Sequence, residues 1–413
     1  MAPKSQRCPI CASPSVESLL KNVYPLYQHP LPTLVDQRNI EISYLICLRC
    51  GHSFMADYDF AELSNIYQDA YYTPALEATD KDAAFGAFYS DFLEKLSLMP
   101  GELRGRGGGR RRTFLEIGCS MGSMLSILHQ GYPNDAFIGI DPDRKNIEFA
   151  AEHLKNATCK LMCGFFPDVF SDSVGLPFLG DSMHVYSRHV IEHVENPLDF
   201  FASQVDLAGV HTVALETPCS DLYLDAGSAM DPFHVEHLHV FSIASLALLL
   251  QKSPLAKLSK YNVNDYGDAM VGLAIADSMQ SRDSYNSNLE SFRLSGKKPD
   301  VLCRKLVLAN EKRIERIERI RRFGRKVVFW GAGSQCASLL SFGLKPQAIF
   351  DGNMNKAGKY MPGFKEPIIH ASRENLSRFN DCHLVISTSF RKSVLKQIGE
   401  YGVSFRSVSS LWY

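Results

Sequence analysis

Thr113-Phe-Leu-Glu-Ile-Gly-Cys-Ser-Met-Gly122 is the stretch that decides the fold of this 413-residue chain. Its apolar first half, its glycine-containing turn and the apolar run from Met124 to His129 predict a strand, a tight turn and a helix. A second apolar run, Ala136-Phe-Ile-Gly-Ile140, predicts a strand that ends in Asp141. A strand, turn and helix followed by a strand ending in an acid is typical of an α/β sheet that binds a nucleotide-type ligand.

Strands and helices continue to alternate beyond this unit. We predict a helix over 143–155 and another from about residue 197. Strands are predicted near 159–163, near 183–187 and at Thr212-Val-Ala-Leu-Glu216. This alternation predicts an open, mostly parallel, doubly wound sheet with ligands at the carboxyl ends of its strands. The expected fold class is therefore α/β.

The turn after the first strand predicts the charge of its ligand. Gly118 and Gly122 let a ligand approach the backbone closely, and Asp141 can accept hydrogen bonds from ribose hydroxyls. The third glycine of a dinucleotide-binding turn is missing, and Glu116 stands immediately before the turn. A carboxylate there repels a pyrophosphate and attracts a cation. S-adenosylmethionine carries an amino group and a sulfonium, so we predict that Glu116, Gly118, Ser120, Gly122 and Asp141 bind it.

Four of the eleven cysteines form two pairs at CxxC spacing near the N-terminus. Two such pairs can supply four thiolates to one tetrahedral zinc ion, which leaves no open coordination position. Redox chemistry needs a single pair at the start of a helix, so structural zinc is the favoured interpretation. The predicted ligands are Cys8, Cys11, Cys47 and Cys50.

A second α/β unit is predicted near the C-terminus. Lys326-Val-Val-Phe-Trp-Gly-Ala-Gly333 predicts a strand and turn, followed by strands at Ala348-Ile-Phe-Asp351 and Leu384-Val-Ile-Ser-Thr388. The turn resembles a dinucleotide site, but Cys336 occupies the third glycine position. We therefore expect three domains: a zinc-binding domain over 1–72, a methyl-donor-binding domain over 73–285 and a Rossmann-like domain over 286–413.

Composition narrows the possible partners and location. Lys and Arg number 44 against 45 Asp and Glu, which leaves no basic field for nucleic acid. The basic stretch Gly105 to Arg112 is interpreted as a solvated linker. The longest apolar run considered, Leu246 to Leu250, is too short to span a membrane, and no apolar leader follows Met1. We expect a cytoplasmic protein that binds neither nucleic acid nor membrane. The sequence does not specify the oligomeric state and is compatible with a monomer.

The whole chain resembles a known family, the three-domain C-methyltransferases of deoxysugar biosynthesis. The E-x-G-x-x-x-G turn from Glu116 to Gly122 resembles that of class I S-adenosylmethionine-dependent methyltransferases in general. The narrower resemblance adds the cysteine pairs and several further segments in the same order. These are Tyr71-Tyr72, Glu216-Thr-Pro218, Glu236-His-Leu-His-Val-Phe-Ser242, Gly331-Ala-Gly333, Asp351-Gly-Asn-Met-Asn-Lys356 and Pro362-Gly363. The resemblance implies an N-terminal zinc domain, a central methyltransferase domain and a C-terminal domain that closes over the nucleotide end of the substrate.

Two histidine-rich segments allow alternative interpretations. His189-Val-Ile-Glu-His193 fits a pattern of inverse zinc proteases, but it follows the fourth strand of a methyltransferase-like sheet, where such sequences are structural or border the cofactor. In the second segment, the resemblance implies that Glu236 and His237 lie at the substrate, with His237 as general base. Glu236 is expected to orient the imidazole or raise its basicity. Structural histidines are the alternative.

The resemblance implies methyl transfer from S-adenosylmethionine to a carbon beside a ketone, C-3 of a nucleotide-linked 4-keto-deoxysugar, through an enolate. His234 stands where related enzymes often have a tyrosine, and Tyr71 or Tyr72 could supply a phenolic donor instead. The alternatives are an O- or N-methyltransferase acting on a non-sugar metabolite, and a non-enzymatic nucleotide-sensing or scaffold protein.

Overall fold

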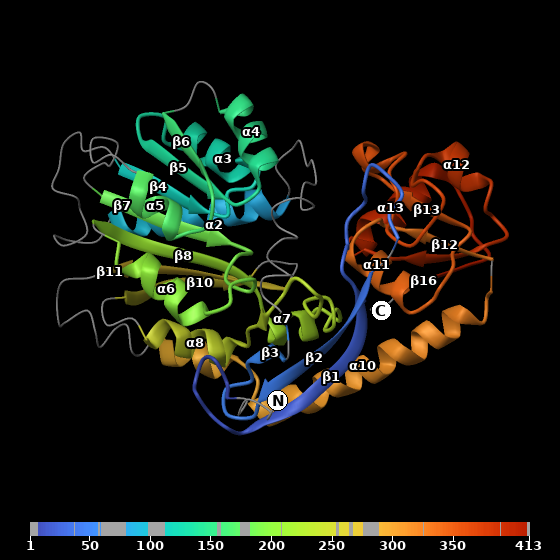
Figure 1. Cartoon of the computed structure of the whole chain (residues 1–413), viewed down its shortest axis with the longest axis horizontal. Coiled ribbons are helices and arrows are strands. Elements are labelled where there is room, and N and C mark those ends of the chain that lie inside the picture. Colours follow the sequence, from blue (N-terminus) through green and yellow to red (C-terminus); the bar gives the residue numbers. More distant parts are fainter. Residues whose placement is uncertain are drawn as a thin grey trace.

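Three β-sheets organise the computed structural model of the chain (Figure 1). The central sheet belongs to the methyltransferase-like region, a smaller sheet lies near the N-terminus, and a parallel sheet forms the C-terminal unit. The structure describes residues 7–36, 38–56, 58, 80–97, 112–154, 158–173, 182–207, 209–252, 256–263, 267–275, 289–324, 326–388 and 390–410.

The central sheet has seven strands, and five neighbouring strands in it are parallel. Two antiparallel strands extend one edge, which the prediction of a mostly parallel sheet did not specify. Their order is β10 (Ala256–Val263), β11 (Asp268–Ile275), β8 (Val210–Pro218), β7 (Ser182–Arg188), β4 (Arg112–Ile117), β5 (Ala136–Asp141) and β6 (Cys159–Cys163). The carboxyl ends of β4, β5, β7 and β8 therefore meet along one edge.

Alternating side chains of β4 explain why helices cover both faces of this sheet. Leu115 and Ile117 pack into one buried cluster, whereas Phe114 packs into another on the opposite face. Asp143 caps one covering helix by accepting from the backbone amides of Lys145 and Asn146. The helices of this region are α2 (Asp80–Ser97), α3 (Ser123–Gly131), α4 (Arg144–His153), α5 (Asp168–Ser173), α6 (Pro197–Val205), α7 (Ser220–Asp225) and α8 (Ile243–Gln251).

The N-terminal sheet takes its last strand from the central region. Strands β1 (Val16–Pro25), β2 (Asn39–Cys47) and β3 (Ser53–Ala56) are antiparallel, and β9 (His239–Val240) pairs with β3. Figure 1 shows β1 and β2 in blue, running from beneath the central sheet towards the C-terminal unit. The predicted boundary near residue 72 lies outside the described residues.

The C-terminal unit is a five-stranded parallel sheet. Its strand order is β14 (Ile369–His370), β13 (Ala348–Asp351), β12 (Val327–Trp330), β15 (His383–Ile386) and β16 (Ser407–Ser410). A long helix, α10, precedes the sheet, and shorter helices accompany it. They are α10 (Pro299–Arg321), α11 (Ser334–Ser341), the short η2 (Met354–Lys356), α12 (Arg373–Ser377) and α13 (Arg391–Tyr401).

The segment between β1 and β2 reaches the C-terminal unit. Leu31 and Tyr360 exchange two backbone hydrogen bonds, both 2.9 Å long. Side chains of β1, β2, α10 and β12 also share one buried apolar cluster with residues 229–240 of the central region. These contacts hold the three units around the segment that contains Glu236 and His237.

Two sequence expectations remain to be placed. Most of the predicted linker, residues 105–111, lies outside the described residues. Among the helices that the structure describes, none is both long and apolar enough to cross a membrane.

Candidate active site

The turn after β4 adopts a backbone that favours glycine. Gly118 and Gly122 both have φ of 77°, and Ser120 between them has φ of 46°. A Cβ on Gly118 would overlap Cγ2 of Val190, and a Cβ on Gly122 would lie 2.8 Å from Cδ1 of Leu154. Positive φ and close approach therefore both require glycine at these two positions.

Asp141 closes this turn from the end of β5. Its Oδ2 accepts a 2.8 Å hydrogen bond from the Ser120 amide, and its Oδ1 accepts a 2.9 Å bond from the Asp143 amide. Burial raises the pKa of the Asp141 carboxyl above its ordinary value. The geometry brings Ser120 and Asp141 together with the two glycines, as a site for an adenosine-type ligand requires.

Glu116 lies beneath the same turn and is only 3% exposed. The Tyr186 hydroxyl donates a 3.1 Å hydrogen bond to its Oε2. Burial raises the pKa of Glu116 to about 8, even though the nearby Arg188 acts in the opposite direction. Without a bound cation this carboxyl is mostly neutral at pH 7, whereas the sequence-based argument treated it as a carboxylate.

The segment that contains Glu236 and His237 is fixed by backbone carbonyl groups. Nδ1 of His237 lies 2.7 Å from the carbonyl oxygen of Pro232. The hydroxyl of Tyr44, on β2, donates to the carbonyl oxygens of His234 and His237 at 2.7 and 2.5 Å. The Pro232 carbonyl therefore orients the imidazole. The expected role of Glu236, to orient the imidazole or raise its basicity, stays a prediction. We call residues 229–239 the base loop.

Burial determines the ionisation of the Glu236–His237 pair. The pKa of His237 is lowered well below its ordinary value, first by burial and then by the neighbouring His234 and His193. His237 is therefore a neutral imidazole at pH 7. Burial raises the pKa of Glu236 to about 7. The structure thus places a neutral nitrogen base beside a carboxyl group that titrates near neutrality.

Two histidines that the sequence did not assign to the site also lie here. Nδ1 of His193 is 2.7 Å from the carbonyl oxygen of Glu236, and its ring centroid is 4.9 Å from that of His237. Nε2 of His29, from the segment between β1 and β2, is 3.6 Å from Oε1 of Glu236. The histidine-rich pattern around residue 193 could have indicated that His193 lies at the site. No pattern in the sequence near His29 indicates the same for that residue.

The other residues predicted to lie at the active site are His234, Tyr71 and Tyr72, and the structure describes only the first of them. The ring of His234 is tilted by 42° against that of His237, with centroids 3.8 Å apart, and burial lowers the pKa of His234 to about 3. The His234 ring therefore stays neutral beside His237. Tyr71 and Tyr72 lie outside the described residues, so their part in the site stays a prediction.

The protease pattern at His189–His193 does not lie on a helix. It forms a turn between β7 and α6. Ligand-type atoms of Glu192, His193 and His237 lie within 4.8 Å of one another, and so do those of His189, Glu216 and Asp268. Both groups border the carboxyl edge of the central sheet, where methyl-donor and substrate sites are expected.

The four cysteines near the N-terminus converge on one point. Sγ atoms of Cys8 and Cys50 are 3.6 Å apart, and those of Cys11 and Cys47 are 3.5 Å apart. All four sulfurs lie within 4.8 Å of one another. Tetrahedral bonds to zinc of about 2.3 Å place sulfurs about 3.8 Å apart, so the arrangement fits a zinc ion. Each CxxC pair is followed by a residue with positive φ, Ala12 at 56° and Gly51 at 72°.

The glycine turn of the C-terminal unit is occupied by its own side chains. Oδ2 of Asp351 accepts a 2.8 Å hydrogen bond from the Ala332 amide and lies 3.2 Å from Nζ of Lys356. Nζ of Lys356 also donates to the carbonyl oxygen of Ala332 at 2.9 Å. Gln335, in the first turn of α11, donates to Oδ1 of Asp231 at 2.7 Å and so joins this unit to the base loop.

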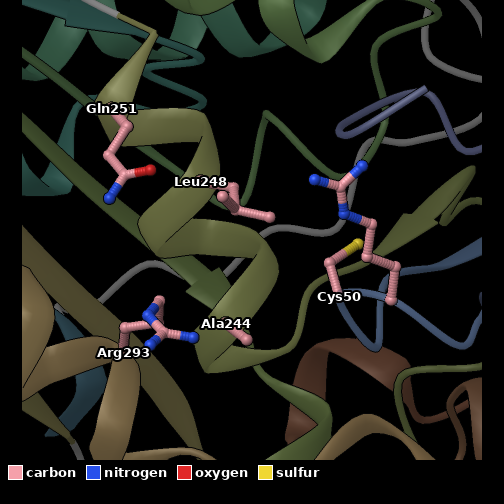
Figure 2. A pocket seen from close by; sticks show the side chains of 6 residues that line it. Cys50, Ala244, Leu248, Gln251 and Arg293 are labelled. Atoms are coloured by element: carbon pink, nitrogen blue, oxygen red, sulfur yellow. The ribbon is translucent and has the colours of Figure 1, made fainter. Parts of the chain in front are cut away.

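A cavity of about 250 Å³ lies elsewhere, beside the second cysteine pair. Figure 2 shows it against α8, with the labelled side chains around it. Its lining shares only Cys50 with the predicted sites. The lining residues are Arg49, Cys50, Ala244, Leu248, Gln251 and Arg293.

Comparison with known proteins identifies two parts of the chain. Residues 87–260 match a family model described as a methyltransferase domain, and residues 304–405 match one described as a C-methyltransferase C-terminal domain. No curated protein matches the chain in sequence. The first matched segment contains the base loop and the turn after β4, residues 118–122, which we call the cofactor turn. The second contains four of the five strands of the C-terminal sheet.

Several solved structures resemble part of the chain. The plantazolicin methyltransferase BpumL in complex with SAH is 13% identical, with a TM-score of 0.36 over 48% of this chain and 87% of that chain. The N-terminal domain of EvdMO1 with SAH bound is 15% identical, with a TM-score of 0.32 over 49% and 83%. WbdD is 16% identical, with a TM-score of 0.33 over 52% and 47%.

The two family models define the class of this protein. The protein is a methyltransferase: it contains a methyltransferase domain and a C-terminal domain of the C-methyltransferase type.

Proposed function

We propose that this enzyme transfers a methyl group to a carbon beside a ketone, at C-3 of a nucleotide-linked 4-keto-deoxysugar. The C-methyltransferase C-terminal domain supports carbon as the methyl acceptor. The buried Glu236–His237 pair supports removal of a proton from that carbon. The proposal that the substrate is a nucleotide-linked sugar rests on the family resemblance described above.

The orientation of His237 is the observation that carries the proposal. Nδ1 faces the Pro232 carbonyl and must donate to it, so in the neutral ring the lone pair is on Nε2. The lowered pKa keeps this nitrogen unprotonated at pH 7. The same lowering makes His237 a weaker base, so removal of a proton from the carbon next to the ketone depends on holding that C–H within hydrogen-bond reach of Nε2.

The proposed reaction proceeds in two steps. Nε2 of His237 takes the C-3 proton, and the electrons of the C–H bond form the enolate. The enolate carbon then forms a bond to the methyl group, whose bond to sulfur breaks with both electrons remaining on sulfur. S-adenosylmethionine, when bound, supplies the methyl group in an activated form. Glu236, neutral or ionised near pH 7, lies where it can exchange a hydrogen bond with the substrate.

Binding roles follow the geometry described above. The backbone of Gly118, Ser120 and Gly122 would hold the methyl donor, with Asp141 at its ribose and Glu116 near its positive charge. We further propose that the four cysteines bind a structural zinc ion and that the C-terminal unit closes over the nucleotide. His29, His193 and His234 would border the sugar.

His237→Asn tests the proposed base. Asparagine can still donate to the Pro232 carbonyl but offers no basic nitrogen. The variant should bind S-adenosylmethionine normally and lose both methyl transfer and exchange of the C-3 hydrogen in deuterated water. Wild-type protein would be assayed with labelled S-adenosylmethionine and a panel of nucleotide-4-ketosugars, and NMR would show the C–H carbon becoming quaternary.

A surface histidine provides the matched control. His153, at the exposed end of α4, contacts the carbonyl oxygen of Phe149, and His153→Asn should keep full activity. Undiminished hydrogen exchange in His237→Asn would remove His237 from the role of base. Methylation at oxygen or nitrogen by the wild-type protein would contradict the proposed acceptor.

A further inference from the structure

One short loop touches both the cofactor turn and the base loop. We call residues 189–193, which follow β7, the bridging loop. The Val190 side chain lies so close to Gly118 that a Cβ there would overlap it. At the other end, His193 contacts the Glu236 carbonyl, and the Glu192 carbonyl accepts a 3.0 Å hydrogen bond from the His239 amide. The position of this loop therefore sets the spacing between methyl donor and base.

His189 lies at the centre of the bridging loop, among three buried carboxyl groups. Its Nδ1 is 3.2 Å from Oε1 of Glu192. Its Nε2 is 3.6 Å from Oδ2 of Asp268 and 4.0 Å from Oε2 of Glu216. These acids come from the loop itself, from β11 and from β8. The His189 ring therefore reaches carboxyl groups of all three elements, by a hydrogen bond through Nδ1 and by ion-pair distances through Nε2.

Other side chains hold the same carboxyl groups in place. The Thr217 hydroxyl donates to Oε2 of Glu192, and the Tyr223 hydroxyl donates to Oδ1 of Asp268, both at 3.0 Å. Nε of Arg188 donates to Oε2 of Glu216 at 2.6 Å. These hydrogen bonds fix the carboxyl groups that His189 contacts. The hydrogen-bond network therefore favours a single position of the bridging loop.

The backbone of His189 shows that this position is imposed. Its φ is 51°, in the left-handed region that residues other than glycine adopt uncommonly, although histidine, asparagine and aspartate enter it more often than the rest. The His189 amide also donates a 2.9 Å hydrogen bond to the Glu216 carbonyl. A strained residue that is held by its neighbours on both sides is a frequent feature of functional loops.

We propose that His189 is a positioning residue that fixes the distance between the methyl donor and the enolate carbon. The inference rests on the proposed function, because it concerns what happens to the enolate. The enolate either regains a proton from His237 or is methylated. Return of the proton requires only that the base loop be placed correctly against the substrate. Methylation also requires the correct position of the cofactor turn relative to the base loop.

His189→Asn is the variant that tests this role. Asparagine tolerates positive φ, so the backbone can keep its conformation while the imidazole ring and its reach to Asp268 are lost. The measurement compares deuterium incorporated into recovered substrate with methylated product in the same reaction. The ratio of exchange to methylation should rise by about tenfold or more, since small misplacements of reacting groups cost rate steeply. Affinity for S-adenosylmethionine should change little.

Asp268→Asn and His153→Asn complete the experiment. Asp268→Asn should raise the ratio in the same direction by a smaller factor, and it carries the test if His189→Asn does not fold. His153→Asn should leave the ratio at the wild-type value. A ratio that stays unchanged while both rates fall together would show a merely structural role and would overturn the inference.

The two proposals fail in different ways. Wild-type protein that neither exchanges nor methylates the ketosugars would refute the proposed function, and this inference with it. Wild-type protein that does both, with an unchanged ratio in the variants, would refute the inference alone.

Discussion

Glu116 should make binding of S-adenosylmethionine strongly dependent on pH. Its pKa is about 8 because it is buried. Below that pH the carboxyl is neutral and offers no charge to a cationic ligand, whereas above it the carboxylate attracts one. Affinity should therefore rise as the pH rises towards 8 and level off beyond it.

The size of the effect follows from the ionised fraction. With a pKa of about 8, roughly 1% of Glu116 is ionised at pH 6, roughly 10% at pH 7 and half at pH 8. If the ionised form binds the ligand, affinity should rise about tenfold per pH unit from 6 to 7 and about fiftyfold in total from 6 to 8. Each tenfold step is about 1.4 kcal/mol of binding free energy.

Calorimetry of ligand binding between pH 6 and 9 measures this dependence. Glu116→Gln removes the titrating group and keeps the shape, so its affinity should remain low and vary little with pH. Adenosine, which lacks the charged α-amino group and the sulfonium of the methionine part, provides the neutral control. The reasoning is refuted if the wild-type affinity changes by less than about twofold between pH 6 and 8, or if Glu116→Gln retains the wild-type slope.

Two further predictions concern the zinc site and the cofactor turn. Purified protein should contain about one zinc ion per chain by elemental analysis, Cys47→Ser should lose it and melt at lower temperature, and Cys163→Ser, at an exposed cysteine outside the cluster, should keep it. Gly122→Ala should lower the free energy of unfolding by about 2–4 kcal/mol, because it adds positive-φ strain and overlap with Leu154. In chemical denaturation Gly131→Ala, where a Cβ meets nothing within 4 Å, should change stability by less than about 1 kcal/mol, and an equal loss in both variants would contradict the steric explanation.

Local patterns predicted the central sheet well. The apolar runs at 113–117 and 136–140 are strands because they are buried on both faces, and the glycine turn between strand and helix has the positive φ that its composition suggested. These features depend on neighbours in sequence, so the sequence is enough to predict them. The α/β fold is confirmed, whereas the zinc ion and the roles of the site residues stay predictions.

Contacts between distant segments could not be predicted in the same way. Nothing near His29 indicates that a turn between two strands carries it to Glu236, and nothing near Pro232 indicates that its carbonyl orients His237. The pairing of β9 with β3 is likewise fixed by the assembled core rather than by its two residues. Such contacts are determined by tertiary packing, which cannot be predicted from the local pattern of apolar and polar residues.

The pairing of Ser53 with Val240 has a consequence for biosynthesis. The cysteine-containing sheet emerges early from the ribosome, yet its fourth strand lies near the end of the methyltransferase region. At roughly 5–20 residues per second, translation takes roughly ten to forty seconds to reach that strand. Throughout this interval the edge of β3 is uncovered, so the nascent chain exposes a strand that can pair with other chains before its own partner has been made.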